Sequence, residues 1–288
     1  MKQKIYKKIM LSFDIEFWHD EGWLSEYMTE EPKEDFIEES LSQVLTSLAK
    51  YNAKATFFIT GKIIEKYPYL LKEIAEKGHE IASHGYTHQP LDKLGAQRFG
   101  VEIQKAVAGI EKTTGKKPKG FRAPSFSLSN KTKWALPILA AHGFKYDSSI
   151  FPVPVHRYGV AEVPEKEYRI SFDDVAQIDP ESPILEIPVA FSSILSFRIP
   201  IAGGVYFRLL PYWIFSGMLR SVQKQRHAAL YFHLYELYNK TPTIRGAPWV
   251  KRAVKYYNVK NNFNRFEKLL RSFQCDSIEN VMGFNKVI

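Results

Sequence analysis

Six side chains that can bind a metal or move a proton lie at the ends of short apolar runs in this sequence. They are two acids, three histidines and one arginine: Asp14, Glu16, His84, His88, His233 and Arg122. In barrels and open α/β sheets, catalytic groups gather at the carboxyl ends of parallel strands. We therefore expect these separate segments to converge on one pocket.

His84 and His88 are four residues apart, a spacing that can direct two imidazoles at one ion. A carboxylate from a neighbouring strand end would complete a three-ligand zinc site with an open position for water. Paired histidines at this spacing also occur on wet surfaces and as capping residues. The acids Asp14 and Glu16 favour the metal interpretation.

The elements that must position these residues alternate between strand and helix. Short apolar runs predict strands, and apolar residues at helical spacing, with Pro68 and Asn130 as helix starts, predict the helices between them. The predicted strands are 8–15, 53–60, 80–83, 120–122, 144–147, 184–188 and 228–233. The predicted helices are 37–48, 68–78, 99–110, one from Asn130, 211–223 and a terminal amphipathic helix, 262–273. This order predicts an α/β fold, with a parallel sheet or barrel surrounded by helices.

One domain is expected to span residues 1–288, because a single α/β barrel commonly has this length. Residues 151–183 lose periodicity and gain Pro, Gly, Asp and Glu, which predicts a long irregular insertion of the kind that often shapes a site.

The net charge of +9 is unevenly distributed. Residues 16–40 carry ten acids and one lysine, whereas the basic tail, 240–271, carries nine Lys/Arg and one acid. The tail could favour an anionic substrate or peripheral association with an acidic membrane surface, and a solvated basic face explains it equally well. Nucleic acid is not supported, because no binding motif accompanies the charge.

Localisation is expected to be cytoplasmic, at the inner face of the membrane if the tail binds lipid. The basic, polar residues 1–8 do not resemble an apolar signal region, and the single cysteine, Cys275, cannot form an internal disulfide. The most apolar stretch, 199–219, is interrupted by Arg208, so no transmembrane helix is predicted.

Five ordered segments resemble the motifs of NodB-homology polysaccharide deacetylases: SFDIE, SHGYTH, GFRAPSFS, YDSSIFP and YFHLYE. The segment GGVYFRLLPY and the tail after Lys251 are similar to the branch found with exosortase and exopolysaccharide gene clusters. The resemblance implies a distorted (β/α) barrel. It also implies a hydrolase that removes N-acetyl or another acyl group from amino sugars of a surface polysaccharide or its lipid-linked precursor. The implied cofactor is a divalent metal, zinc in the first place, with cobalt or another divalent ion as alternatives.

By the same resemblance, Asp14 is the catalytic base and His84 and His88 hold the metal. The commonest first motif of the family has two adjacent aspartates, the second of which is a metal ligand. That place is taken here by Ile15, and the carboxylate follows one residue later, so Glu16 becomes the expected third ligand.

The remaining motifs imply supporting roles. Arg122 pairs with the base, and His233 is the general acid, with Asp147 as its orienting partner. A turn-forming role of Asp147 is equally open. Glu236 could also face the pocket and is assigned no step. The expected substrate groove is lined by Trp18, Pro124 and Phe126, although core packing is the commoner role of such aromatic side chains.

Two other functions compete with this interpretation. Some relatives on the same scaffold open cyclic amides without a metal. The intact pair His84 and His88 argues against that function here. The other is a non-catalytic glycan-binding protein. The only feature that suggests it is Ile15, which stands where the family commonly has a metal-binding aspartate. Polymer and lipid-linked precursor, the sugar, and the oligomeric state are not distinguished by the residues.

Overall fold

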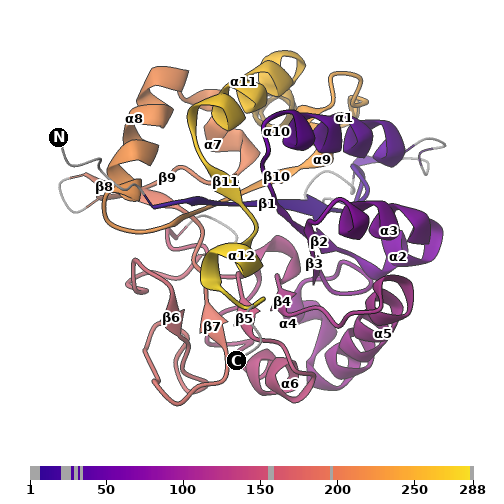
Figure 1. Cartoon of the computed structure of the whole chain (residues 1–288), viewed down its shortest axis with the longest axis vertical. Coiled ribbons are helices and arrows are strands. Elements are labelled where there is room, and N and C mark those ends of the chain that lie inside the picture. The colour runs from indigo at the N-terminus through magenta and orange to yellow at the C-terminus, as the bar shows by residue number, and fades with distance from the viewer. Residues whose placement is uncertain are drawn as a thin grey trace.

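The computed structural model describes residues 7–20, 27, 28, 32, 35–154, 159–194 and 197–285 (Figure 1). Its centre is a parallel sheet of short strands: β1 (Ile9–Ile15), β2 (Thr56–Ile59), β3 (Glu80–Ser83), β4 (Gly120–Phe121), β5 (Tyr146–Asp147), β7 (Leu185–Glu186) and β10 (Ala228–His233). The strands follow the order β10-β1-β2-β3-β4-β5-β7, after which β6 (Tyr168–Arg169) pairs antiparallel with β7. A short strand, β11 (Cys275–Asp276), adds to β1 in parallel.

The sheet curls back toward its first strand. Val189, just after β7, forms a parallel bridge with Ala229 of β10, and the amide of Ala190 donates to the Ala229 carbonyl at 2.8 Å. The expected distorted (β/α) barrel is therefore confirmed. Because the main strands run parallel, their carboxyl ends meet at one edge, which is where the polar residues of the motifs lie.

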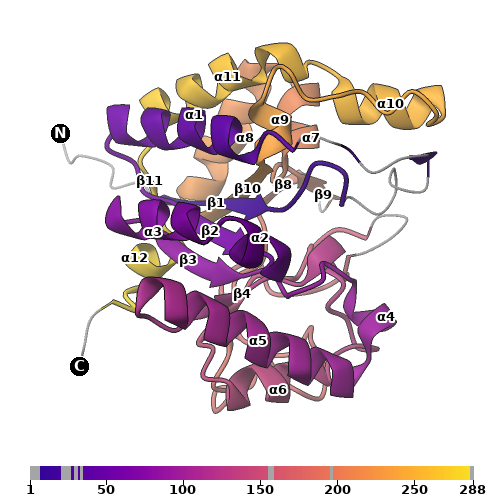
Figure 2. The same ribbon diagram turned by 90° about the vertical axis from the view of Figure 1, so that its right-hand side faces the viewer.

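Helices cover the outside of this barrel (Figure 2). The longer ones are α1 (Ile37–Lys50), α3 (Pro68–Glu76), α5 (Ala96–Thr114), α8 (Tyr212–Gln223) and α11 (Val259–Ser272). The shorter ones are α2 (Gly61–Lys66), α4 (Leu91–Leu94), α6 (Ala135–Ala141), α7 (Gly204–Leu209), α9 (Leu234–Leu237), α10 (Trp249–Tyr256), α12 (Ile278–Met282) and the 3₁₀ turn η2 (Pro124–Phe126). The apolar spacing in α1 has the expected effect, because Leu41, Val44 and Leu48 are fully buried. Each such side chain contributes roughly 1.5–3 kcal/mol by leaving water.

Several elements differ from the expectation. α6 begins at Ala135, and the side chain of Asn130 instead donates to Asp174 and accepts from the amide of Val175, so it anchors the insertion rather than capping a helix. The hairpin of β8 (Phe191–Ile194) and β9 (Phe197–Pro200) was not predicted. The basic tail contains α10 and most of α11, and β11 and α12 follow it, so the chain after Lys240 is largely ordered structure.

Among the described helices, none combines the length and the apolar content that crossing a bilayer requires.

Candidate active site

Strand alternation places the two acids of the first motif together. Successive side chains of a strand point to opposite faces, so Asp14 and Glu16 share a face and Ile15 points the other way. Ile15 is 1% exposed and belongs to the main apolar core, whereas Glu16 reaches the edge where the parallel strands end. The one-residue displacement of the acid therefore keeps both carboxylates on the site side of β1.

Two histidines converge on the carboxylate of Glu16. Nε2 of His88 contacts Glu16 Oε2, and Nε2 of His84 lies 3.6 Å from the same oxygen. The backbone carbonyl of Arg122 lies 2.8 Å from Nδ1 of His84. A carbonyl can only accept, so Nδ1 donates to it, and Nε2 is the ring nitrogen that faces Glu16. His88 adopts a left-handed backbone conformation, φ 61°, which is uncommon outside glycine and directs its ring into the site.

These three side chains fit a divalent metal. One ligand atom from each lies within 4.8 Å of the others, and all three side chains are buried. Two imidazoles and one carboxylate are the donor set of catalytic zinc sites that keep a position open for water. Burial by itself would raise the pKa of Glu16, but the charges of His88 and His233 hold it well below its usual range, so the carboxylate is ionised.

The predicted base, Asp14, is fixed by a buried arginine. Arg122 is fully buried, and its Nη1 donates to Asp14 Oδ1 at 2.7 Å and to Ser12 Oγ at 2.9 Å. The rest of the guanidinium donates to the carbonyl and hydroxyl of Ser148, both at 3.0 Å. Asp14 therefore presents its second oxygen, Oδ2, to the site.

His233 ends β10 and is paired with Asp14 in the register of β1 and β10. Its Nε2 lies 4.0 Å from Asp14 Oδ2 and 3.5 Å from Glu16 Oε1. Its Nδ1 lies 3.1 Å from Glu236 Oε2, and Glu236 also accepts from the backbone amide of His233. Glu236 is in turn held by Arg208, whose Nη1 donates to Oε1 at 2.5 Å.

The expected orienting partner of His233 was Asp147, and the contacts correct this. The carboxylate of Asp147 accepts from the amide and the hydroxyl of Ser149, at 3.0 and 2.6 Å. Burial raises the pKa of both Asp147 and the neighbouring Glu186, whose Oε1 accepts from the amide of Ile150. Asp147 therefore orders the chain around Ser149, and Glu236, on the same turn as His233, orients the histidine.

The charges around His233 favour its protonated form. Burial would lower the pKa of His233, but the carboxylates of Glu16, Glu236 and Asp14 raise it to about 10. Burial likewise opposes ionisation of Glu236, and Arg208 and His233 nevertheless lower its pKa to about 2. A cation bound by Glu16 would reduce that residue's share of the effect on His233.

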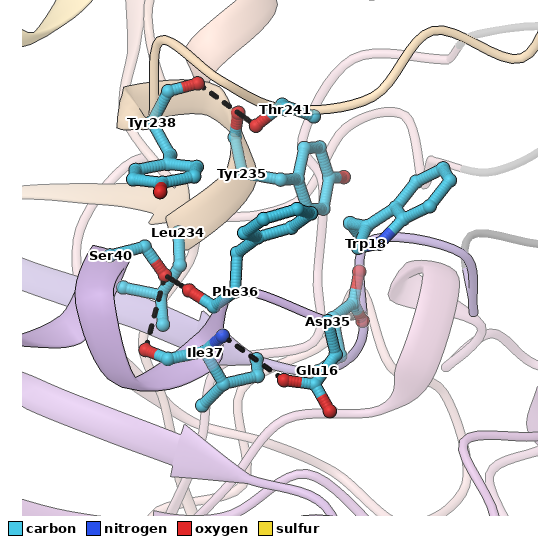
Figure 3. A pocket seen from close by; sticks show the side chains of 10 residues that line it. All are labelled: Glu16, Trp18, Asp35, Phe36, Ile37, Ser40, Leu234, Tyr235, Tyr238 and Thr241. Atoms are coloured by element: carbon cyan, nitrogen blue, oxygen red, sulfur yellow. Dashed lines mark hydrogen bonds between the residues drawn. The ribbon is translucent and has the colours of Figure 1, made fainter. Parts of the chain in front are cut away.

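A pocket adjoins the site on the side of Trp18. It is a small cavity of about 10 Å³, and its lining includes Glu16, Trp18, Phe36 and Tyr235. Figure 3 shows the rings of Trp18, Phe36, Tyr235 and Tyr238 among the side chains that line this space. Trp18 is 6% exposed, so little of its ring is open to solvent.

The other two expected groove residues are buried. Pro124 lies in η2, and Phe126 is 7% exposed, with its ring centre 4.8 Å from that of Tyr231 and 5.7 Å from that of Phe151. Phe126 also lies over the guanidinium of Arg122, at 5.7 Å. In this structure both residues pack the wall behind the site, and their contact with substrate stays a prediction.

Arg208 is the functional candidate that the sequence interpretation missed, and Glu236 was left without a role. The glycines of the GGVYFR segment were the available signal. A Cβ on Gly204 would lie 2.2 Å from the carboxylate atoms of Glu236, so glycine leaves the room that this side chain occupies.

A family model described as polysaccharide deacetylase matches residues 3–146, half of the 288 residues. The chain belongs to the polysaccharide deacetylase family. The match includes the segments of Asp14, Glu16 and His84 and confirms the family that the motifs indicated. A second model, a domain of unknown function (DUF3473), matches residues 148–283, the part of this deacetylase-family chain that carries His233 and Arg208.

Curated relatives match part of the chain. A peptidoglycan deacetylase of Helicobacter pylori is 33% identical over 150 residues, 50% of this chain and 50% of that protein. A peptidoglycan-N-acetylglucosamine deacetylase of Bacillus cereus is 37% identical over 94 residues, 32% of this chain and 34% of that protein. The chain thus spans half or less of the length of these relatives.

Solved structures share the fold over nearly the whole chain. A proposed polysaccharide deacetylase from Mycobacterium smegmatis superposes with a TM-score of 0.58 at 17% identity, covering 99% of this chain and 91% of that chain. A CE4 family pseudoenzyme from Bacillus anthracis gives 0.52 at 14% identity, covering 97% and 66%. Because the fold is common to both, it does not decide activity, which depends on the side chains of the site.

Proposed function

We propose that this chain is a divalent-metal-dependent hydrolase that removes the N-acetyl group from amino sugars of a surface polysaccharide or its lipid-linked precursor. The observation that carries the proposal is that two groups of side chains meet at the carboxyl ends of the parallel strands. One group is the ligand set Glu16, His84 and His88. The other is a fixed carboxylate, Asp14, opposite an oriented imidazole, His233.

A divalent ion held by Glu16, His84 and His88, with zinc as the first choice and cobalt as a substitute, would supply the Lewis acidity that activates water and polarises an acyl carbonyl. The remaining steps depend on groups of the chain itself.

Asp14 is placed to take the proton from the attacking water. Its Oδ1 accepts from Arg122 Nη1 at 2.7 Å, which fixes the plane of the carboxylate. Oδ2 faces His233, and this leaves one defined oxygen for proton transfer.

His233 is placed to give a proton to the leaving amine. Glu236 accepts from Nδ1, so the second proton of the imidazolium is on Nε2, which faces the two carboxylates of the site. An amine is a poor leaving group until it is protonated, and a histidine kept cationic at neutral pH provides that proton. Separate groups thus act as base and acid on opposite sides of the reacting carbon.

The substrate class is supported by the relatives, two of which are named as peptidoglycan deacetylases. We propose that the rings beside Glu16 contact a sugar next to the scissile amide. We extend the proposal to a cytoplasmic site of action at the inner membrane face, where a lipid-linked precursor would be reached.

The test is acetate release from acetylated amino-sugar oligomers by metal-stripped protein, before and after addition of zinc or cobalt. His84→Ala is expected to abolish both metal binding and release. His142→Ala is the matched control, because Nδ1 of His142 bonds its own helix at the Ile138 carbonyl, and it should retain both.

Other results would replace the proposal. Hydrolysis of a cyclic amide that survives metal removal would favour the metal-independent hydrolase. Glycan binding without release under any metal would favour a non-catalytic glycan-binding protein. Metal binding without acetate release would point to another acyl group.

A further inference from the structure

Helix α10 presents its apolar side chains to solvent. Trp249 is 77% exposed and Val250 is 52% exposed, Ala253 is also exposed, and Tyr257, which directly follows the helix, is 53% exposed. At about 100° per residue, these four positions lie within an arc of about 100°. They form one continuous face, called here the α10 apolar face.

The cationic side of the same helix faces the protein. Lys255 is 3% exposed, its Nζ donates to the carbonyl of Trp18 at 3.3 Å, and it lies 4.5 Å from the ring centre of Tyr235. Nζ of Lys251 donates to the hydroxyl of Tyr27 at 3.0 Å. An ordinary surface helix buries its apolar stripe and exposes its charges, so α10 is inverted. This arrangement needs a partner for the α10 apolar face.

The helix stands at the rim of the candidate active site. The residues that Lys255 contacts, Trp18 and Tyr235, line the pocket with Glu16. Figure 2 shows α10 projecting from the end of the molecule toward which the parallel strands run. Arg208, which holds Glu236, also donates to the carbonyls of Val254 and Lys255 at the end of α10.

The segment of the sequence that contains α10 is basic, although the acid-rich segment 16–40 contacts it through Trp18 and Tyr27. Residues 237–266 contain seven Lys/Arg (Lys240, Arg245, Lys251, Arg252, Lys255, Lys260 and Arg265) and no acid. Arg245 and Lys260, on either side of the helix, are exposed.

We propose that the α10 apolar face docks on an anionic lipid surface. Tryptophan and tyrosine side chains are well suited to the boundary between headgroups and acyl chains, and flanking cations are attracted to anionic headgroups. Docking would turn the rim of the site toward the membrane. The benefit of this for a lipid-linked sugar rests on the proposed function, whereas the docking itself does not require turnover.

Charge favours lipid over a second copy of the chain. A two-fold interface through this face would bring the same cations of both copies together, with no acid in residues 237–266 to compensate them. An anionic bilayer neutralises them instead.

The experiment is co-sedimentation of the full chain with phosphatidylcholine vesicles, with and without phosphatidylglycerol. Binding is expected with the anionic vesicles alone and should weaken as salt rises. Val250→Glu and Trp249→Ala are each expected to lower the partition coefficient about tenfold. Val101→Glu is the matched control, because Val101 is 51% exposed on α5, away from α10, and should bind like the wild type.

Three outcomes would overturn the docking proposal: wild-type protein that stays unbound, Val250→Glu protein that binds as well as Val101→Glu, or a wild-type dimer in sedimentation equilibrium that Val250→Glu dissociates. Acetate release from soluble oligomers should be unchanged in Val250→Glu. If all variants bind lipid as expected and no preparation releases acetate, the proposed function fails while the docking surface stands.

Discussion

Glu236 connects the buried Arg208 and the partly buried His233, so its charge is expected to affect both stability and catalysis. Its carboxylate accepts from Arg208 at 2.5 Å and holds Nδ1 of His233 at 3.1 Å. The substitution Glu236→Gln preserves the shape but removes the charge, which leaves the guanidinium of Arg208, 2% exposed, without an anionic partner. Breaking a buried ion pair in this way costs about 3–5 kcal/mol of unfolding free energy.

The effect on catalysis comes from the bond to His233. A hydrogen bond to a charged group contributes about 1.5–3 kcal/mol. If that bond is needed in the transition state, its loss lowers kcat/KM by roughly 10- to 150-fold. The neutral amide also withdraws a charge that raises the pKa of His233, so the basic limb of the pH profile of kcat/KM should move to lower pH.

Urea denaturation and acetate release measure the two effects separately. Glu267→Gln is the matched control, because Glu267 pairs with Lys50 at 2.9 Å on the surface, where the change should cost less than about 1 kcal/mol and leave activity intact. The double variant Arg208→Met with Glu236→Gln removes both buried charges, so it should recover stability without recovering activity. If Glu236→Gln behaves like Glu267→Gln in both assays, the orienting role is refuted.

Three further predictions concern neighbouring positions. Gly204→Ala would place a Cβ 2.2 Å from the Glu236 carboxylate and should lower acetate release at least about tenfold. The control is Gly217→Ala, on the exposed side of α8, where a Cβ would have no described atom within 4 Å. This control should raise the free energy of unfolding in urea by about 0.5–1 kcal/mol. Ile15→Asp would bury an uncompensated charge, which should lower the free energy of unfolding by about 3–5 kcal/mol. The zinc affinity of this variant, measured by calorimetry, should not exceed that of the wild type. Burial raises the pKa of Glu80 from 4.5 to about 7. The stability that protonated Glu80 contributes is fully present below its pKa in the unfolded chain and is lost as pH rises through its pKa in the folded protein. The free energy of unfolding, measured by urea denaturation at each pH, should fall by about 3 kcal/mol over that range. Glu80→Gln should flatten that dependence.

The sequence by itself determined the barrel class and most of the site. Strand period and apolar runs are local signals, so β3 and β10 were predicted with their observed bounds, and α1 and α11 within three residues at each end. The position of a polar residue at a strand end is equally local. Parallel pairing then brings such ends together, which predicts one cluster of polar side chains, and the motif resemblance supplied Glu16 as the ligand beside His84 and His88.

Tertiary structure alone decided which charged groups pair. Asp147 and Glu236 are both acids close to motif residues, and nothing local tells which one reaches His233. Burial of Asp147 against Glu186 and Ser149 excludes it, and Arg208, distant in sequence, holds Glu236 in place. The inverted placement of α10 is also a tertiary property. Its periodicity shows an apolar face, but whether that face points inward or outward depends on what the rest of the chain leaves uncovered.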